Sequence, residues 1–473
     1  MFTKKKIFEN KDVFFLAIII FSAFFLRIYN LNFEDYWFDE QASFWVADPS
    51  LTLNETIQRG KELDQGTGII FNLILKIFFS LSNYNPQIGR YLPFVFGLLS
   101  IPALSYLTYQ IKQNKSYLLV GILSSINFYL ISYSQEVRVY SFLFFISILN
   151  IILFFKLLEI DNTFWKKNLY SFFYILFSLL GVCLHIFFFI ITFSQFLFLF
   201  INFLFRKKKV ILNILCVLSV PILYILFTYE YLLLQIEAQH TWIQQVNLDF
   251  FYNFFFSRFF GSKIMGIIYL LILIYLFYNN RRKIFNIDNK NYLLIFILIF
   301  SYALPLLYGL YKQPILIDRY IIFVLVPIFI LISTLTLDIK NLKIRYFILT
   351  IILASSLINN YIEIFERKKT KPEFNKMIKY ISKSNDAYIL TKANDDNVEK
   401  IVINYSKNTI LGKKDNINFL SSNFDISELK EIWLICYQPI NGFDCSPEPY
   451  SFSNWLKVDN VEFKLINATL FKK

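Results

Sequence analysis

Long apolar stretches alternate with short polar segments along most of the chain. Because a helix needs about 20 apolar residues to cross a bilayer, this pattern predicts a polytopic α-helical membrane protein with about 11 transmembrane helices. The stretches that we expect to cross the membrane are 13–26, 91–110, 117–134, 138–155, 169–184, 186–205, 210–228, 264–278, 292–308, 320–337 and 346–361.

One further apolar stretch, 67–82, is too short to cross a bilayer and contains Lys76. We expect it to form an interfacial or re-entrant helix on the outer face, within an acidic first loop that covers residues 30–90.

The distribution of Lys and Arg fixes the predicted orientation. Cytoplasmic loops of membrane proteins are rich in Lys and Arg, and here the basic runs RKKK at 206–209 and RRK at 281–283 fall on the same side as the N-terminal KKK. If 67–82 crossed the membrane, both runs would face outward. The N-terminus is therefore expected in the cytoplasm, and an odd number of crossings places the C-terminus outside.

The long apolar stretches end before residue 371, and a more charged, less apolar pattern follows. Short apolar runs alternate with helix-like segments in 371–473, which indicates a small periplasmic α/β domain after a transmembrane domain at 1–361. We expect strands at 386–390, 408–412, 431–437 and 462–471. Cys436 and Cys445 lie in this domain, and the sequence leaves open whether they form a disulfide.

Composition narrows the class of protein. Hydrophobic residues make up 56% of the 473 residues and charged residues only 17%, which excludes a disordered chain and an ordinary cytosolic enzyme. The net charge of +13 is explained by the cytoplasmic loops, so we expect no nucleic acid partner.

Ionisable residues beside membrane spans are costly unless they are paired or functional, and the unusual ones here all fall on the predicted outer face. Asp39 and Glu40 follow the first span. The others come from three distant parts of the chain: Glu136, Arg138 and Tyr140; His185; and Asp318, Arg319 and Tyr320.

This set of side chains suits chemistry on a lipid-borne phosphate. A carboxylate can take a proton from an attacking hydroxyl, and guanidinium groups can hold a phosphate as it leaves. A nucleotide sugar is a poor candidate donor, because such donors are made in the cytoplasm. The two histidines show no zinc-ligand spacing. We predict no resident metal, although a divalent cation stays a candidate cofactor.

Several short motifs carry a resemblance. In order, they are Asp39-Glu40, RYLPFVFG from Arg90 to Gly97, YSQEVRVY from Tyr133 to Tyr140, the outward His185, and PILIDRY from Pro314 to Tyr320. Over residues 1–360 this order resembles the bacterial dolichyl-phosphate-mannose protein mannosyltransferase-like family, which is glycosyltransferase family 39. These enzymes are membrane-embedded C-superfamily glycosyltransferases that use a polyprenyl-phosphate sugar.

The resemblance implies an inverting sugar transfer with Asp39 as general base and Glu40 as its partner. It places Arg138 and Arg319 near the lipid phosphate, with Tyr140 and Tyr320 beside them. Relatives commonly carry His and two prolines before the interfacial segment, where this chain has DQGTGII. Acceptor or metal contacts in that part of the loop are therefore not carried over.

Each candidate residue has a simpler interpretation as well. Asp39 could cap a helix over 40–47, the two arginines could be anchors at span ends, and His185 could be a helix-end histidine. Trp37 could stack on a sugar or belong to the interfacial aromatic belt.

The sequence thus favours a multi-pass enzyme of the bacterial inner membrane. It would transfer a sugar from a polyprenyl-phosphate carrier to a periplasmic glycan, lipid or protein acceptor, with lipopolysaccharide among the candidates. A lipid-linked sugar flippase and an O-antigen polymerase-type protein are the alternatives.

Overall fold

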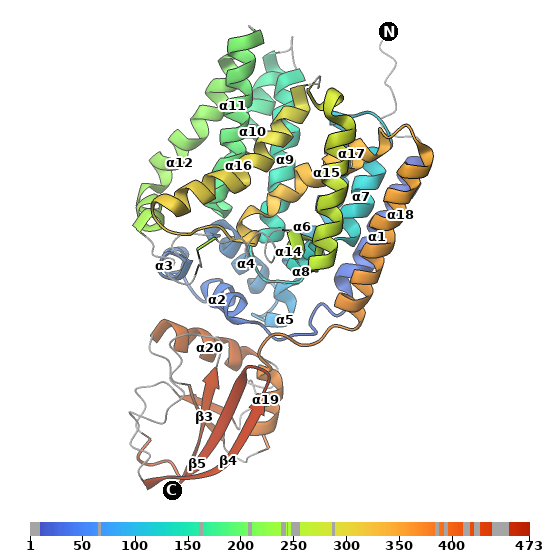
Figure 1. Ribbon diagram of the computed structural model, residues 1–473. Helices are drawn as coiled ribbons and strands as arrows, with labels where there is room; N and C mark the ends of the chain where they lie inside the picture. Colours follow the sequence, from blue (N-terminus) through green and yellow to red (C-terminus); the bar gives the residue numbers. More distant parts are fainter. Residues whose placement is uncertain are drawn as a thin grey trace. The chain divides into compact units, whose positions relative to one another are not determined.

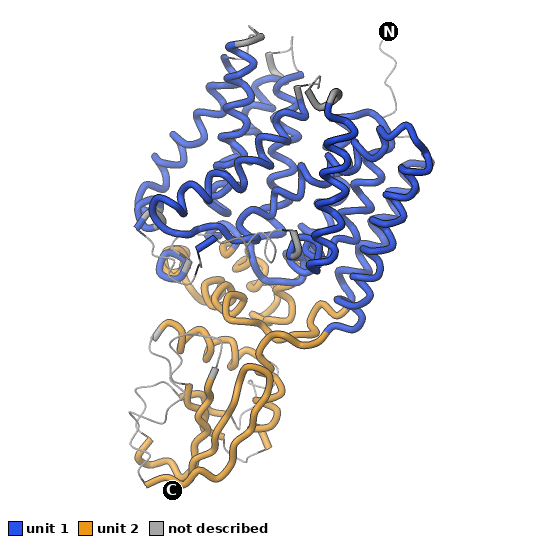
Figure 2. The backbone as a smooth tube through the Cα atoms, in the orientation of Figure 1, with its two compact units in different colours: residues 1–29, 60–71, 93–367 blue, residues 30–59, 72–92, 368–473 orange. Residues whose placement is uncertain are grey.

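The structure is a computed structural model. It describes residues 10–64, 68–159, 164–206, 211–237, 243, 245–246, 256–285, 289–383, 387–391, 396–409, 417–420, 426–437 and 454–473. Contacts divide the chain into two compact units (Figure 2). Unit 1 comprises 1–29, 60–71 and 93–367, and unit 2 comprises 30–59, 72–92 and 368–473. The domain boundaries expected from composition stay a prediction.

Unit 1 is helical (Figure 1). Its elements are α1 (Asn10–Ile28), most of α6 (Tyr91–Ile111), α7 (Ser116–Ile126), α8 (Phe128–Ser134), α9 (Tyr140–Glu159), α10 (Phe164–Leu184), η1 (Ile186–Phe188), α11 (Phe189–Arg206), α12 (Ile211–Glu237), α14 (Phe256–Phe260), α15 (Lys263–Phe285), α16 (Asn289–Tyr311), η3 (Asp318–Val324), α17 (Leu325–Leu337), α18 (Leu342–Asn360) and η4 (Tyr361–Phe365).

Nine helices in the described residues are long and apolar enough to cross a membrane, and the bent pair α7–α8 would make ten. The sequence predicted about eleven, and its first candidate is α1, which carries Lys11, Asp12 and Arg27. The predicted polytopic helical fold is confirmed. The short stretch expected at the interface forms α4 (Ile69–Ser80), a helix of 12 residues.

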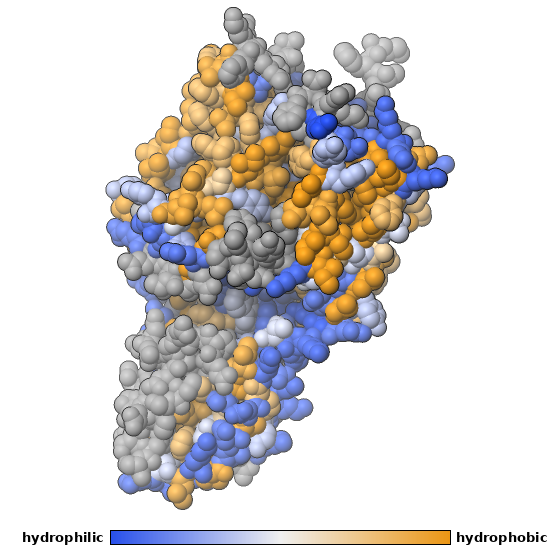
Figure 3. Space-filling model, in the orientation of Figure 1, coloured by the Kyte–Doolittle hydropathy of each residue, from blue (hydrophilic) through white to orange (hydrophobic). Residues whose placement is uncertain are grey.

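Burial separates the centre of unit 1 from its surface. Every residue of α17 from Leu325 to Thr336 is buried, as expected for a helix that is apolar on all sides. By contrast, α15 exposes Ile264, Ile267 and Leu271. Figure 3 shows hydrophobic side chains over the outer surface of α15, a surface suited to lipid.

The stretch expected as one span over 117–134 is broken at Asn127. Helices α7 and α8 meet there at 59°, because Asn127 has an extended backbone and its side chain accepts a hydrogen bond from the Leu130 N–H at 3.0 Å. Asn is a preferred residue at the start of a helix. The sequence interpretation overlooked this capping signal inside an apolar run.

The break leaves the last carbonyls of α7 without partners in their own helix. Arg27, which is fully buried, donates to the Ser124 and Ser125 carbonyls at 2.9 Å each, and the Asn360 amide donates to the Ile126 carbonyl at 2.6 Å. A buried arginine at the negative end of a helix is favourable. These hydrogen bonds give the buried Arg27 a structural role at the end of α7.

Unit 2 joins the first loop to the C-terminal segment. The loop contributes α2 (Phe38–Val46), the first part of α3 (Leu53–Asp64), most of α4, and α5 (Pro86–Gly89). The C-terminal segment contributes α19 (Phe374–Ile381), α20 (Asp396–Asn408) and the strands β1 (Ala387–Thr391), β2 (Ile417–Leu420), β3 (Glu431–Tyr437), β4 (Leu456–Phe463) and β5 (Ile466–Lys472).

The five strands form one sheet in the order β2-β1-β3-β5-β4. Strand β1 is parallel to β2 and β3, whereas β5 is antiparallel to both β3 and β4. The predicted small α/β domain is confirmed. Cys436, in strand β3, is disulfide-bonded. Its candidate partner Cys445 lies outside the described residues.

Two expected strands differ in part from the described structure. The segment 462–471 is not one strand, because Leu465 adopts a left-handed backbone with φ 57° and forms a turn between the end of β4 and β5. The segment 408–412 begins in the last residue of α20, and its residues 410–412 lie outside the described part of the chain.

Candidate functional site

Helix α2 carries the two acidic residues that the sequence singled out. Trp37, with an extended backbone, occupies the position before its first turn, so Asp39 lies inside the helix. The interpretation of Asp39 as the capping residue is therefore wrong. Glu40 accepts a hydrogen bond from the Trp37 backbone N–H at 3.4 Å, and both acids lie in the first turn, where negative charge is favourable.

Glu40 is fully buried and paired with Arg90. The Arg90 Nε and Nη2 atoms donate to the two Glu40 carboxylate oxygens at 3.0 Å each, which is a bidentate pair. The Lys371 ammonium lies 2.8 Å from the same carboxylate. Burial alone would raise the pKa of Glu40, but attraction to Arg90 and Lys371 outweighs it and lowers the pKa to about 2.

Arg90 also organises the chain that leads to α2. Its Nη1 atom donates to the carbonyls of Leu31 at 3.1 Å and Glu34 at 2.6 Å, and its Nη2 atom donates to the Asp35 carbonyl at 3.3 Å. One guanidinium therefore fixes both the loop before α2 and the helix itself. Arg90 lies within one of the sequence motifs, but no local pattern predicts its partners.

The carboxylates of Glu34 and Asp35 are directed to the C-terminal segment. Glu34 accepts from the Thr370 hydroxyl at 2.9 Å and the Lys371 N–H at 3.2 Å, and Asp35 accepts from the Asn375 N–H at 2.8 Å. Burial raises the pKa of Asp35, and the hydrogen bonds from Asn375 offset part of that rise.

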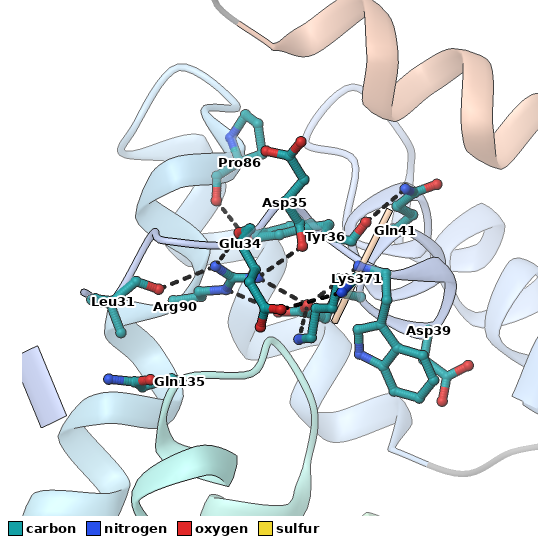
Figure 4. Close-up of polar contacts among 12 residues, drawn as sticks. Leu31, Glu34, Asp35, Tyr36, Asp39, Gln41, Pro86, Arg90, Gln135 and Lys371 are labelled. Atoms are coloured by element: carbon teal, nitrogen blue, oxygen red, sulfur yellow. Dashed lines mark hydrogen bonds and ion pairs between the residues drawn. The ribbon is translucent and has the colours of Figure 1, made fainter. Parts of the chain in front are cut away.

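Asp39 has a different setting from these three acids. It is half-buried, and in Figure 4 its carboxylate points away from Arg90 and Lys371. Its neighbour Trp37 lies beside the Lys371 ammonium, which is 5.9 Å from the centre of the indole ring.

A polar cleft opens next to the loop before α2. It has about 380 Å³ of empty space, part of which is open to solvent. Its lining residues are Asn32, Glu34, Asp35, Tyr36, Pro86, Gln87, Arg90, Asn375, Tyr405 and Thr409. The cleft therefore combines amide and carboxyl groups with two tyrosine rings.

The remaining candidate residues belong to unit 1, where the structure brings several together. The guanidinium carbon of Arg319 lies 5.7 Å from the centre of the Tyr140 ring and 5.9 Å from that of Tyr320. The His185 ring lies 4.5 Å from the Tyr320 ring. Arg138 is buried two residues before Tyr140, and its backbone N–H donates to the Glu136 carbonyl at 2.7 Å.

His185 and Asp318 each have a defined contact within this group. The His185 Nδ1 atom accepts from the Phe187 N–H at 3.2 Å, which begins the short helix η1. This agrees with the simpler interpretation of a helix-end histidine. Asp318 is buried and lies 3.9 Å from the guanidinium of Arg258, whose side chain is half exposed. The sequence interpretation missed Arg258, because it lies in an aromatic run without a motif.

Asp39 and Glu40 thus belong to unit 2, whereas the arginine and tyrosine group belongs to unit 1. Their convergence on one substrate stays a prediction. The described residues contain no group of three or more His, Cys, Asp and Glu side chains that could hold a metal ion.

Known proteins resemble this chain in fold rather than in sequence. No known family pattern and no curated protein matches the sequence. Among solved structures, ArnT from Cupriavidus metallidurans bound to undecaprenyl phosphate matches with a TM-score of 0.57 and 8% identity, over 97% of each chain. The apo oligosaccharyltransferase of Archaeoglobus fulgidus matches with a TM-score of 0.53 and 13% identity, over 89% of this chain and 62% of that one.

These matches define the class of fold. The chain shares its fold with ArnT and with the archaeal oligosaccharyltransferase, in agreement with the fold that the resemblance of its motifs implied. At 8% and 13% identity, the likeness concerns the fold alone.

Proposed function

We propose that this multi-pass membrane protein transfers a sugar from a polyprenyl-phosphate carrier to an acceptor hydroxyl, with inversion at the sugar. The acceptor is a glycan, a lipid or a protein. The observation that carries the proposal is the difference in setting between two adjacent carboxylates of α2. Arg90 and Lys371 hold the Glu40 carboxylate in place, whereas the adjacent Asp39 carboxylate is directed elsewhere and is half-buried.

Asp39 is the proposed general base. It takes the proton of the acceptor hydroxyl while that oxygen forms a bond to the anomeric carbon of the sugar. The bond between the anomeric carbon and the phosphate oxygen breaks, and the polyprenyl phosphate leaves with the electron pair. A carboxylate whose pKa is about 2 is a poor proton acceptor, which favours a positioning role for Glu40.

Arg138 and Arg319 are the proposed partners of the leaving phosphate, with Tyr140 and Tyr320 packed beside Arg319. Guanidinium groups match the geometry of phosphate oxygens and stabilise the charge that develops there. The undecaprenyl phosphate present in the ArnT structure supports a carrier of this type. Glu136, His185 and Asp318 shape the same region.

The proposed location is the bacterial inner membrane, with the N-terminus in the cytoplasm and unit 2 in the periplasm. The basic cytoplasmic loops support this orientation. The disulfide at Cys436 supports an oxidising environment for the C-terminal segment.

Transport of a lipid-linked sugar is the alternative that the structure addresses most directly. Transporters place broken helices and ionisable residues near the middle of the membrane, and the α7–α8 pair is a broken helix, although Arg27 beside it lies in the last turn of α1. However, Arg27 and Asn360 already satisfy the carbonyls at the break. This argues for a structural break.

The function is tested with the Asp39→Asn variant, which keeps the size of the side chain but removes the base. Membranes are supplied with the lipid-linked sugar fraction extracted from a deletion strain, in which the donor should accumulate, and products are identified by mass spectrometry. We expect transfer to fall by about 100-fold or more.

The matched control is Glu462→Gln, which removes an exposed carboxylate from the edge strand β4. Transfer by Asp39→Asn at the wild-type rate would contradict the mechanism. If the deletion strain lost transport of the lipid-linked sugar without any change in sugar linkage, the protein would be a flippase. A product with many repeating units would identify a polymerase.

A further inference from the structure

The segment that enters the C-terminal domain follows the acidic loop at close range. We call residues 369–375 the strap. The Lys369 ammonium lies 5.5 Å from the centre of the Phe33 ring, the Thr370 hydroxyl donates to Glu34, and the Asn375 backbone donates to Asp35. The strap thus contacts consecutive positions of the loop, all within unit 2.

Lys371 is the residue of the strap that contacts the surroundings of Asp39. Its ammonium lies 2.8 Å from the Glu40 carboxylate, and it faces the Trp37 ring at 5.9 Å. The residues on the N-terminal and C-terminal sides of the Phe38-Asp39 pair therefore both contact one lysine. Its side chain is only 12% exposed, so bulk water does not replace this contact without rearrangement.

The strap is anchored at its far end by the domain that follows. Helix α19 begins at Phe374 and buries Phe374, Met377, Ile378 and Ile381 completely. Helix α20 adds a second attachment, because the Tyr405 hydroxyl accepts from the Tyr36 N–H at 3.1 Å and the two rings stack at 5.2 Å. Residues 33–40 are therefore held in place by contacts with a packed domain.

We propose that the C-terminal segment positions the catalytic loop, with Lys371 as a positioning residue that fixes Asp39 through Glu40 and Trp37. This inference rests on the proposed function of Asp39. The C-terminal domain would then be part of the transferase site and not a separate binding module. A misplacement of a reacting group by about 1 Å can cost about 100-fold in rate, so loss of Lys371 should be visible in turnover.

The test compares Lys371→Met with Lys379→Met, which removes the same charge from an exposed position of α19. In the full-length protein in lipid nanodiscs, we expect kcat of Lys371→Met to fall by about 10- to 100-fold. Binding of undecaprenyl phosphate should stay within twofold of wild type, because the proposed phosphate ligands belong to unit 1. Lys371→Arg should recover part of the turnover, and Lys379→Met should behave like wild type.

A second measurement does not depend on activity. Hydrogen–deuterium exchange of peptides from residues 30–46 should increase in Lys371→Met and stay unchanged in Lys379→Met. Unchanged exchange in this loop, or turnover of Lys371→Met within threefold of wild type, would contradict the positioning role of Lys371.

The proposed function fails separately, if wild-type protein and Asp39→Asn give equal sugar transfer. Should Lys371→Met not fold, Asn375→Ala serves instead, because it removes the side-chain amide that also donates to the Asp35 carboxylate and keeps the backbone donor. It is judged by the same exchange and turnover criteria.

Discussion

Arg90 and Glu40 form a two-point ion pair, with both bonds at 3.0 Å and both side chains almost completely buried. Fifty positions separate them in the sequence. The pair therefore joins the residue before α6 to the first turn of α2, and it fixes the helix that carries Asp39.

Removing one partner of this pair should destabilise the protein. Glu40→Gln leaves the Arg90 charge buried without its carboxylate, and breaking a buried pair in this way costs about 3–5 kcal/mol. The melting temperature in detergent measures the effect. The control is Glu431→Gln, which removes a partner of the partly exposed Lys472–Glu431 pair, and ion pairs at the surface contribute at most about 1 kcal/mol. Equal losses in the two variants would contradict a structural role for the buried pair.

Acidification should reveal the same carboxylate. The pKa of Glu40 is lowered from 4.5 to about 2 in the folded protein, so its contribution to stability is present above pH 4.5 and is lost as the pH falls towards 2. We expect the melting temperature to decrease over this interval in wild type and to decrease less in Glu40→Gln.

Asp35 contributes with the opposite sign. Burial raises its pKa in the folded protein, so its protonation on acidification favours folding. This opposing effect is removed by comparing Asp35→Asn with the double variant that carries both Asp35→Asn and Glu40→Gln. Identical pH profiles for the two proteins in that background would show that the ionisation of Glu40 does not control acid stability.

Arg27 should be required for the stability of unit 1. Arg27→Met removes two hydrogen bonds to the end of α7, and hydrogen bonds from charged groups contribute roughly 1.5–3 kcal/mol each. We expect a clear decrease in melting temperature. Lys343→Met, an exposed lysine in the first turn of α18, is the control, and an equal decrease there would refute the capping role.

Donor binding should depend on the shape of the arginines and not only on their charge. Arg319→Lys and Arg138→Lys keep the charge but lose the planar fork that binds phosphate. Native mass spectrometry with undecaprenyl phosphate should show weaker binding, by about 10-fold or more. Arg345→Lys, whose arginine donates to the Leu337 carbonyl, should bind like wild type. Unchanged binding in both variants of the candidate site would exclude them as phosphate ligands.

Periodic and apolar patterns predicted the fold well, because membrane helices and short buried strands leave local signals. The helical unit, the short helix α4 and the strands near 387 and 431 follow directly from such runs. The break at Asn127 was missed because one polar residue hardly changes the apolarity of its surroundings. The hairpin at Leu465 was missed because leucine rarely adopts a left-handed backbone.

The site was predicted in part. Motifs singled out Asp39, Glu40 and Arg90, but the pairing of Glu40 with Arg90 and Lys371 requires the folded chain. Lys371 lies in a polar segment rich in lysine, and no local pattern distinguishes it from Lys369 or Lys376. Arg258 was hidden in the same way among phenylalanines.

The contact between Lys371 and Glu40 also bears on when the protein becomes active. The two residues are 331 positions apart, so the loop that carries Asp39 leaves the ribosome long before its strap. Synthesis proceeds at about 5–20 residues per second, which puts at least about 16 seconds between the two. A nascent or prematurely terminated chain can therefore insert its helices while its first loop still lacks the strap, and the proposed site is completed only after residue 371 has been synthesised.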